Sequence, residues 1–476
     1  MSAWDVGFQP GWDGKDPVRQ EGEIDPETAD SVHGGQVRLA YRLAASHSGQ
    51  LMHVASIGWH HWDGTRWAVD EEAAHGYRAV LDVLRQALAD SINDKGLRKD
   101  VARCENDTGI RGILAIAAAL EQFAYTVNDL DTDSYLLNCS NGTLDLRTKA
   151  LGPHDPRDRI TKVTRGAYRP EQTDDAWTEF LNTVLPDEQV RGYFQRLIGL
   201  SLLGKVVEHI FTIATGTGAN GKGTAYNAIL HALGDYGHVA ESDLFMQAKS
   251  NPNAAAPAQM GLRGKRLIVV SETEREHRLA VALMKNLTGG DPITARPLYG
   301  RPVTFPPSHT SLMVTNFLPK VAGDDPAAWR RIRVVPFDVV IPEAERDGLL
   351  GGRLQLAADT ILTWAVGGYS EYEVRGMDAP VAVTVATGDY LKASDAVARF
   401  VDECCLVNPH MFVTMGDLFE RWIKWSKDDG AEEMSKRAFG VALDGHGYLA
   451  KRTGGISRRH GLGLAADEDD EEPKTW

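Results

Sequence analysis

The spacing of apolar residues changes along the chain, and each change predicts a different kind of element. Apolar residues recur at helical spacing over 75–128 and 343–372, which predicts helices in both stretches. The segment 51–70 favours two strands joined by an Asp63-Gly64 turn, and residues 134–168 favour a short strand-rich insert before helices resume at 174–204. The apolar face expected for the second helical stretch is formed by Leu349, Leu350, Leu354, Leu356, Ile361, Leu362 and Trp364.

Between 206 and 340 the pattern becomes strand, loop and helix. The apolar runs HIFTIATG, RLIVVSE and TSLMVTN have the length and composition of buried parallel strands, so an α/β core is expected there. Residues 395–464 give three helix-like and two strand-like pieces, which suits a winged helix-turn-helix. The expected segments are a flexible leader at 1–35, a mainly helical N-terminal domain with a small β insert at 36–205, the α/β core at 206–340, a helical lid and connector at 341–394, a winged-helix-like domain at 395–465 and an acidic tail at 466–476.

The net charge of −15 over 476 residues argues against a nucleic-acid partner for the average surface. The charge is uneven, however, because an acidic run occupies 467–472 and basic residues dominate 435–460. Within the basic segment, SKRAFGVALDGHGY resembles a recognition helix and KRTGGISRRHG resembles a wing, so a DNA-contacting face is one interpretation and an ordinary solvated face is the other. The expected DNA contacts there are Lys436, Arg437, Lys451 and Arg452.

Composition also limits the cellular setting. The four cysteines lack C-x-x-C spacing, which supports neither a zinc ribbon nor a disulfide framework. The chain has no apolar stretch of about 18 residues and no basic region followed by an apolar core at its start, so we expect a cytoplasmic protein with no membrane segment.

A glycine-rich segment, GTGANGKGT, lies between a predicted strand and a predicted helix, where a phosphate-binding loop belongs. Glycines let backbone N–H groups turn toward phosphates, and Lys222 adds an ammonium group. Gly223 occupies the usual Ser or Thr position, so the magnesium-binding hydroxyl must come from Thr224 or be replaced by water. The residues expected to bind ATP are Gly216, Thr217, Gly218, Ala219, Asn220, Gly221, Lys222, Gly223 and Thr224.

Three further polar groups lie next to the ends of predicted strands, in this order along the chain. Glu272 ends RLIVVSE and could contact Mg²⁺ and polarise the attacking water. Asn316 ends TSLMVTN and could hydrogen-bond a γ-phosphate, although Asn is also a common turn former. Arg330 and Arg331 precede another strand and could neutralise a transferred phosphoryl group across a subunit boundary, or pair with Asp324 and Asp325 instead.

GTGANGKGT, RLIVVSETE, LMKNLTGGDPITARPLYGRPVTFPPS, LMVTNFLP and WRRIRVVPF, in this order, resemble the superfamily 3 helicase core of phage, plasmid and poxvirus primase-helicases. The resemblance covers roughly residues 36 to 465. It implies an AAA+ ATPase that forms a ring, usually a hexamer, with ATP and Mg²⁺ between subunits. Lys222 and Thr224 then match the phosphate loop, Glu272 the acidic motif, Asn316 the first sensor, and Arg330 or Arg331 the finger donated in trans.

The same family carries a hairpin that grips single-stranded DNA, and ITARPLYGRPVTF occupies its position. Strand-like residues on both sides of Tyr299-Gly300 would expose Arg296, Arg301 and the tyrosine ring. Arginine contacts phosphates and tyrosine stacks on bases, both without reading sequence. A hairpin packed on its own domain is the alternative.

The sequence therefore predicts a ring-forming, ATP-dependent replicative helicase of a phage or mobile element, acting on single-stranded and forked DNA in the bacterial cytoplasm. Relatives often carry an upstream primase domain, for which residues 1–35 leave no room, so any primase is expected to be a separate partner. Two alternatives remain open: an origin-binding ring without nucleotide turnover, and a DNA-stimulated ATPase that senses DNA without unwinding it.

Overall fold

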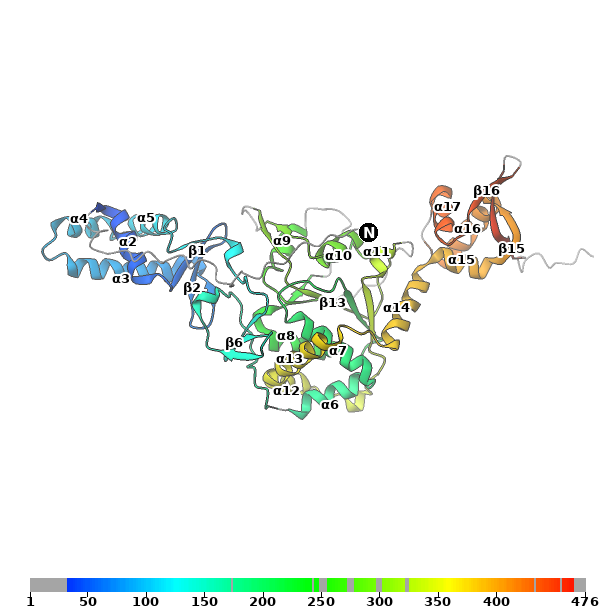
Figure 1. Ribbon diagram of the computed structural model, residues 1–476, viewed down its shortest axis with the longest axis horizontal. Coiled ribbons are helices and arrows are strands. Elements are labelled where there is room, and N and C mark those ends of the chain that lie inside the picture. Colours follow the sequence, from blue (N-terminus) through cyan, green and yellow to red (C-terminus); the bar gives the residue numbers. More distant parts are fainter. Residues whose placement is uncertain are drawn as a thin grey trace, which may run out of the picture. The chain divides into compact units, whose positions relative to one another are not determined.

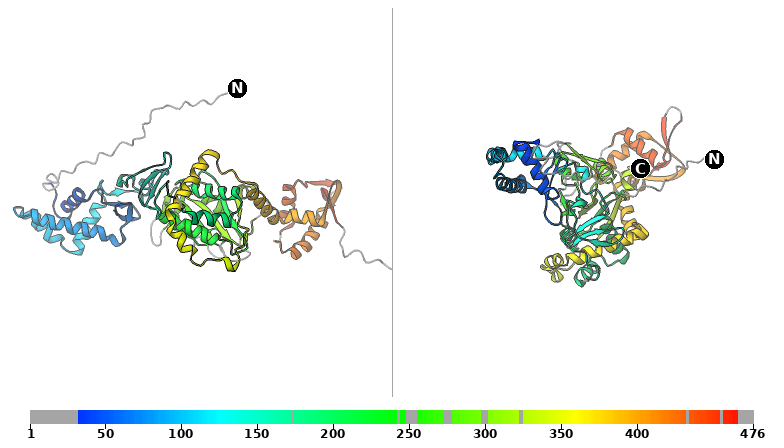
Figure 2. Two further views of the ribbon diagram at one scale, coloured as in Figure 1. Left: turned by 90° about the horizontal axis from the view of Figure 1, so that it is seen from below. Right: turned by 60° about the vertical axis from the view of Figure 1, so that its left-hand side comes forward.

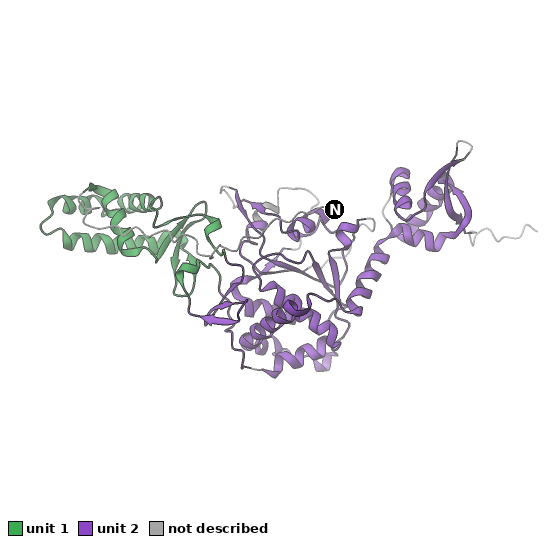
Figure 3. Cartoon of the chain, in the orientation of Figure 1, with its two compact units in different colours: residues 1–132, 154–162 green, residues 133–153, 163–476 purple. Residues whose placement is uncertain are grey.

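The computed structural model describes residues 32–172, 174–241, 244–247, 255–271, 278–296, 302–321, 325–431, 434–453 and 456–465. These residues belong to two units (Figure 3). Unit 1 comprises Met1–Thr132 and His154–Lys162, and unit 2 comprises Asp133–Pro153 and Val163–Trp476. The expected domain at 36–205 is therefore divided between the units, with its β insert and last two helices in unit 2.

Unit 1 combines a helical bundle with a four-stranded sheet of order β3-β2-β1-β4 (Figure 1). Buried apolar residues at helical spacing, among them Leu43, Val80, Leu84 and Ile113, join the helices in one core. The elements are α2 (Gly35–His47), β1 (Leu51–Val54), β2 (Gly58–Trp62), β3 (Trp67–Val69), α3 (Ala74–Asp90), α4 (Lys95–Cys104), α5 (Asp107–Ala117) and β4 (Ala124–Tyr125).

The segment 51–70 forms three strands rather than the expected two. A turn closed by the Ile57 N–H donating to the Val54 carbonyl (3.0 Å) separates β1 from β2, and Ser56 within it has a positive φ of 67°. β2 and β3 do flank Asp63-Gly64, and the Trp62 and Trp67 rings meet across them at 5.9 Å. These tryptophans therefore pack on each other across the hairpin.

Unit 2 is built on a five-stranded, all-parallel sheet of order β14-β8-β13-β10-β9. β8, β10 and β13 carry the three apolar runs and are almost wholly buried, which confirms the expected parallel strands. The strands are β8 (Phe211–Thr215), β9 (Gly237–Ala240), β10 (Leu267–Ser271), β13 (Thr310–Thr315) and β14 (Ile332–Pro336).

Helices cover the sheet of unit 2, and α13 packs on both α7 and α8 (Figure 1, Figure 2). The apolar face predicted for 343–372 is correct at Leu354, Ile361 and Leu362, which are buried. It is wrong at Leu349 and Leu356, which are 78% and 89% exposed. The helices are α6 (Asp175–Val184), α7 (Glu188–Ser201), α8 (Lys222–Leu233), α9 (Ala255–Met260), α10 (Val281–Leu287), α11 (Pro326–Trp329), α12 (Leu350–Leu356), α13 (Ala358–Arg375) and α14 (Val381–Ser394).

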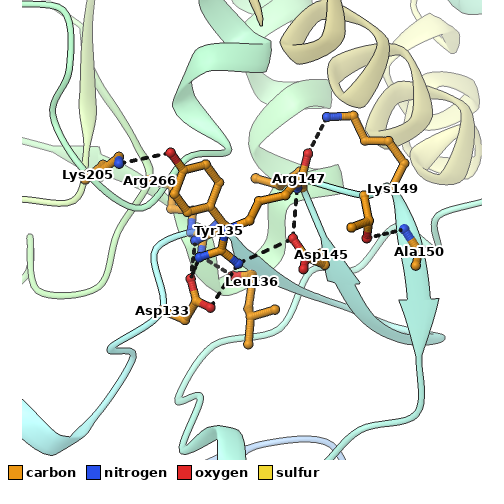
Figure 4. A network of polar contacts seen from close by, with 11 residues as sticks. Asp133, Tyr135, Leu136, Asp145, Arg147, Lys149, Ala150, Lys205 and Arg266 are labelled. Carbon is orange, nitrogen blue, oxygen red and sulfur yellow. Dashed lines mark hydrogen bonds and ion pairs between the residues drawn. The ribbon is translucent and has the colours of Figure 1, made fainter. Parts of the chain in front are cut away.

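A network of polar contacts joins the small β insert to the rest of unit 2 (Figure 4). Its strands β5 (Leu136–Cys139), β6 (Gly142–Asp145) and β7 (Ala150–Gly152) form an antiparallel sheet. Arg147 pairs with Asp133 at 2.8 Å and lies over the Tyr135 ring, whose hydroxyl accepts from Lys205 Nζ at 3.1 Å. Arg266 also donates to the Leu136 carbonyl, so the insert belongs with the parallel sheet rather than with unit 1.

The C-terminal part of unit 2 has the order helix, strand, helix, helix, strand, strand. Its three strands form an antiparallel sheet of order β15-β17-β16, one strand more than expected, around a core that includes Phe400, Trp422 and Phe439. The elements are α15 (Ala396–Cys404), β15 (Cys405–Thr414), α16 (Met415–Asp429), α17 (Lys436–Gly445), β16 (Ala450–Thr453) and β17 (Ile456–Leu464).

Two sequence-based exclusions can be compared with the described residues. No helix among them has the length and apolar character needed to cross a bilayer. Cys104, Cys139, Cys404 and Cys405 are all buried free thiols, so the structure holds no disulfide between them.

Candidate functional site

The glycine-rich loop connects β8 to α8 at the carboxyl edge of the parallel sheet. Its backbone is specific to glycine at two positions. A Cβ on Gly216 would lie 2.2 Å from the Phe337 carbonyl oxygen, and one on Gly221 would lie 2.4 Å from Val184 Cγ1. Gly221 also has a φ of 78° and precedes the first residue of α8. The loop therefore leads directly into a helix N-terminus, which attracts anions.

Asn220 holds this loop against β14. Its side chain is 4% exposed, and Nδ2 donates to the Phe337 carbonyl at 3.1 Å while Oδ1 accepts from the Lys222 N–H at 3.4 Å. The Ile341 N–H donates to the Ala219 carbonyl at 2.8 Å and adds a second fastening. No role beyond membership of the loop could be predicted for Asn220, because nothing in the neighbouring sequence shows that its partner lies 117 residues away.

Lys222 and Asn316 meet at the edge of the sheet. Lys222 Nζ donates to Asn316 Oδ1 at 3.2 Å and to the Gly216 carbonyl at 2.8 Å. β13 pairs in parallel with β8, so residues just past the ends of both strands reach the same edge. The structure thus brings together two of the residues that the sequence ordered along the chain.

The Lys222 ammonium lacks a neutralising partner among the residues that the structure describes. The residue is 5% exposed, and its described acceptors are a carbonyl and an amide oxygen rather than a carboxylate. Burial lowers its pKa to about 8. A buried cation beside glycine-rich backbone and a helix N-terminus favours an anionic ligand.

The magnesium ligands proposed from the sequence are only partly described. Thr224 is half-buried in the first turn of α8. At Gly223 a Cβ would meet only Tyr226 Cε1, at 4.0 Å, so the space around this position would also accept a serine or threonine side chain. Glu272 lies outside the described residues.

The three arginines around β14 have different environments. Arg330 is exposed, whereas Arg331 is 9% exposed and its Nη1 donates to the Ala327 carbonyl at 3.1 Å. Arg333 donates to the Arg330 carbonyl at 3.0 Å. Asp325, the carboxylate considered as an alternative partner, instead pairs with Lys285 at 2.6 Å and caps α11. Asp324 lies outside the described residues.

The Lys285–Asp325 pair gives a structural position to a lysine whose role the sequence did not define. Burial alone would raise the pKa of Asp325, but hydrogen bonds from Lys285 and the Ala328 N–H outweigh it and hold the pKa below its usual value. This pair links α10 to α11, the short helix that ends at Trp329.

The expected hairpin is present as β11 (Ile293–Ala295) and β12 (Val303–Phe305), which pair antiparallel. The sequence predicts strands over Ile293 to Leu298 and Pro302 to Phe305, but Arg296 and Pro302 already lie outside the paired strands. Ile293, Ala295, Val303 and Phe305 are buried, while Thr294 and Thr304 contact each other on the exposed side at 2.8 Å. Arg296 is exposed just past β11. Tyr299 and Arg301 lie outside the described residues.

The basic C-terminal segment contains both exposed and buried arginines. Lys436 and Arg437 are exposed in the first turn of α17, and Lys451 and Arg452 are exposed on β16. Arg459 is only 4% exposed; it pairs with Asp444 and donates to the Gly440 carbonyl at 2.8 Å. The Arg459 guanidinium is paired with Asp444 and does not add to the exposed positive charge, so the basic surface is smaller than the sequence indicates.

Comparison with known families places three regions of the chain. Residues 40–186 match a family described as D5 N terminal like, residues 214–331 match a family of unknown function (DUF5906), and residues 392–460 match a family described as poxvirus D5 protein-like. The second match contains the glycine-rich loop, Asn316 and Arg330.

Relatives in large DNA viruses have names from nucleic-acid metabolism. A protein of Acanthamoeba polyphaga mimivirus named "Putative helicase" is 27% identical over 72% of this chain and 38% of its own length. A "Putative helicase" of Frog virus 3 is 25% identical over 64% and 32%. A "Putative primase" of African swine fever virus is 23% identical over 50% and 26%. The chain thus spans less than two fifths of the length of these relatives.

Among solved structures, the C-terminal region of NrS-1 resembles this chain with a TM-score of 0.38 and 11% identity, covering 66% of this chain and 87% of that one. A likeness at this level establishes neither a shared fold nor a shared function.

Proposed function

We propose that this chain, whose residues 40–186 and 392–460 match D5-like family models, is an ATP- and Mg²⁺-dependent DNA helicase of the primase-helicase family that acts in the replication of a phage or other mobile element. The observation that carries this proposal is the buried Lys222 ammonium, which shares a hydrogen bond with Asn316 at the end of a glycine-rich loop. The parallel sheet of order β14-β8-β13-β10-β9 supports assigning an AAA+ type core to this region.

In this proposal the loop Gly216–Thr224 holds the triphosphate. Backbone N–H groups at the start of α8 bind phosphate oxygens, and Lys222 exchanges its contact with the Gly216 carbonyl for an anionic oxygen. Asn316 remains hydrogen-bonded near the terminal phosphate and orients the attacking water.

Thr224 and Glu272 would hold the magnesium ion, which supplies charge neutralisation at the phosphate oxygens. Thr224 fits this role because its hydroxyl is carried on the first turn of the helix that follows the loop. Gly223 supplies no hydroxyl, so the hydroxyl ligand would have to come from Thr224.

Arg330 is the better of the two proposed fingers. It is exposed at the end of α11, whereas the buried Arg331 guanidinium already donates to its own helix. A neighbouring subunit, in a ring that we propose to be hexameric, would receive Arg330 at its phosphate loop.

DNA contacts are assigned to two surfaces of unit 2. Arg296, together with Tyr299 and Arg301 outside the described residues, would grip a single strand at the β11–β12 hairpin, where nucleotide-dependent movement would pull it. The order α15-β15-α16-α17-β16-β17 supports a winged-helix assignment, with Lys436 and Arg437 on the recognition helix and Lys451 and Arg452 on the wing.

An unwinding assay on a forked duplex separates this proposal from its two alternatives. The helicase predicts ATP-dependent strand separation that is lost in Lys222→Ala and Asn316→Ala and kept in the control Asn286→Ala, an exposed amide on α10. An origin-binding ring would bind DNA without turnover, and a DNA sensor would hydrolyse ATP without separating strands. Either result contradicts the helicase proposal.

A further inference from the structure

Three metal-ligating side chains meet in unit 1, remote in sequence from every residue of the proposed motor. His61 lies on β2, Asp70 directly follows β3, and His75 is in the first turn of α3. β2 and β3 pair antiparallel, and only four residues separate Asp70 from His75, so the three side chains are held on one short framework.

The distances within this cluster approach those of a metal site. One donor atom from each residue lies within 4.8 Å of the others, and His75 Nδ1 is 3.0 Å from Asp70 Oδ1. A tetrahedral ion with bonds of about 2.0–2.1 Å holds its donor atoms about 3.4 Å apart. The His75–Asp70 edge is therefore close to the required spacing, while His61 reaches it only after one of the two imidazole rings turns.

Asp70 is fixed in place before any ion binds. The residue is 5% exposed, and its two carboxylate oxygens accept from the backbone N–H groups of His75 and Gly76, each at 2.9 Å. Each oxygen retains further lone pairs, because a carboxylate offers about four acceptor directions. A buried carboxylate held in this way is a preorganised ligand for a cation.

His61 provides an independent observation. Its Nδ1 is buried and has no hydrogen-bond partner among the described residues. A buried nitrogen in this state costs free energy that a bound ion would recover. The His61 and His75 rings are stacked with centroids 3.6 Å apart and 10° between their planes, so the nitrogen lone pairs of the two rings lie in nearly parallel planes. One ring must turn for both to face an ion, and the His75 side chain, 43% exposed, has room to do so.

We propose that His61, Asp70 and His75 bind one divalent transition-metal ion, of which Zn²⁺ fits best. Two imidazole nitrogens and one carboxylate oxygen form a donor set that zinc accepts, with a water molecule at the fourth position. The ion would fasten β2, the end of β3 and the start of α3 to one another.

The test uses the full chain, stripped of metal with a chelator and titrated with Zn²⁺ alone in a calorimeter. We expect His61→Gln and His75→Gln each to lose one bound ion per chain relative to the parent, and His47→Gln to lose none. His47 is the matched control because it lies in unit 1 at the end of α2. Equal stoichiometry in the parent and both cluster variants would overturn the proposal.

A second measurement does not depend on the folding of any variant. Co²⁺ added to the metal-free parent chain should give the visible absorption bands of a tetrahedral site, and Zn²⁺ should displace them. A parent chain that binds Co²⁺ with only the weak bands of an octahedral aquo ion would contradict the site. Neither result depends on ATP turnover, so failure here leaves the motor proposal unaffected.

Discussion

At the scale of single residues, the charge of Lys222 controls the phosphate loop. Its ammonium is buried and contacts only neutral oxygens among the described residues, so a bound triphosphate would be its first anionic partner there. Anion binding favours the protonated form and therefore raises the pKa of Lys222 from its unliganded value of about 8.

This linkage predicts how nucleotide affinity depends on pH. Below about pH 8 the unliganded lysine is already charged and the affinity for ATP is constant. Above it, binding must also take up a proton, so the affinity should fall by up to about tenfold per pH unit. Equilibrium binding of a fluorescent ATP analogue between pH 7 and 10 measures this. Lys222→Arg, which stays charged, should flatten the profile; a flat profile in the parent would contradict the role of Lys222.

The order of motifs predicted separately that Lys222 binds phosphate and that Asn316 hydrogen-bonds a γ-phosphate. The direct contact between them was not predicted; it follows from the parallel pairing of β8 with β13, which brings the segments after both strands to one edge. Burial of individual arginines could not be predicted. Arg331 and Arg459 stand in basic runs beside exposed arginines, and only their tertiary partners, the Ala327 carbonyl and Asp444, distinguish them.

The cluster of His61, Asp70 and His75 was also missed, because these residues do not show the spacing of a known metal-binding motif in the sequence.

At the scale of elements, the β11–β12 hairpin has one buried face and an exposed residue, Arg296, beyond its first strand. Arg296→Ala should weaken single-stranded DNA binding about three- to tenfold. It should also reduce the slope of log affinity against log salt concentration by about one, because one phosphate contact is lost. ATP hydrolysis without DNA should not change. The control Arg98→Ala removes an exposed arginine of α4 in unit 1. Equal losses in both variants would mean that Arg296 contributes only general charge.

The basic surface of the C-terminal elements makes a separate prediction. Replacing Lys436, Arg437, Lys451 and Arg452 together by Ala should abolish duplex binding and leave the melting temperature nearly unchanged, because all four are exposed. Arg459→Met should instead destabilise the fold by on the order of 2 kcal/mol, because Gly440 and Asp444 lose their donor. Filter binding and thermal melting separate the two effects, and duplex binding that survives the fourfold change would contradict the assignment.

Strands with continuous apolar runs were predicted well, because burial on both faces leaves a clear signal in β8, β10 and β13. Shorter features were predicted less well. The separation of β1 from β2 depends on a turn in which Ser56, beside apolar neighbours, adopts a positive φ and Gly58 follows with a φ of 117°. Leu349 and Leu356 continue a helical apolar pattern but lie on the exposed side of the short helix region around α12.

At the scale of the whole molecule, the division into units could not be predicted from composition. The β insert and α6–α7 follow the helical N-terminal region without a linker signal, yet Leu137, Trp177 and Phe194 share one core with the parallel sheet. Long-range packing decides this boundary, and the apolar pattern alone carries no information about which core a segment joins.

If the protein forms a ring, substitutions at the neighbouring Arg330 and Arg331 should have different effects. Mixing parent chains with Arg330→Ala chains should reduce ATP turnover more steeply than the fraction of parent chains, because each changed subunit impairs its neighbour's site. Arg331→Ala should mainly lower the melting temperature, since that guanidinium is internal. A strictly proportional loss with Arg330→Ala would show that this arginine does not act in trans.

The decisive measurement for the proposed motor is the rate of ATP hydrolysis by the full chain, with and without single-stranded DNA, in the presence of Mg²⁺. We expect that DNA stimulates hydrolysis, and that the rate falls at least about 100-fold in Lys222→Ala and in Asn316→Ala but stays at the parental level in Asn286→Ala. Hydrolysis that survives Lys222→Ala, or a parent chain without turnover on any DNA, would contradict the proposed motor.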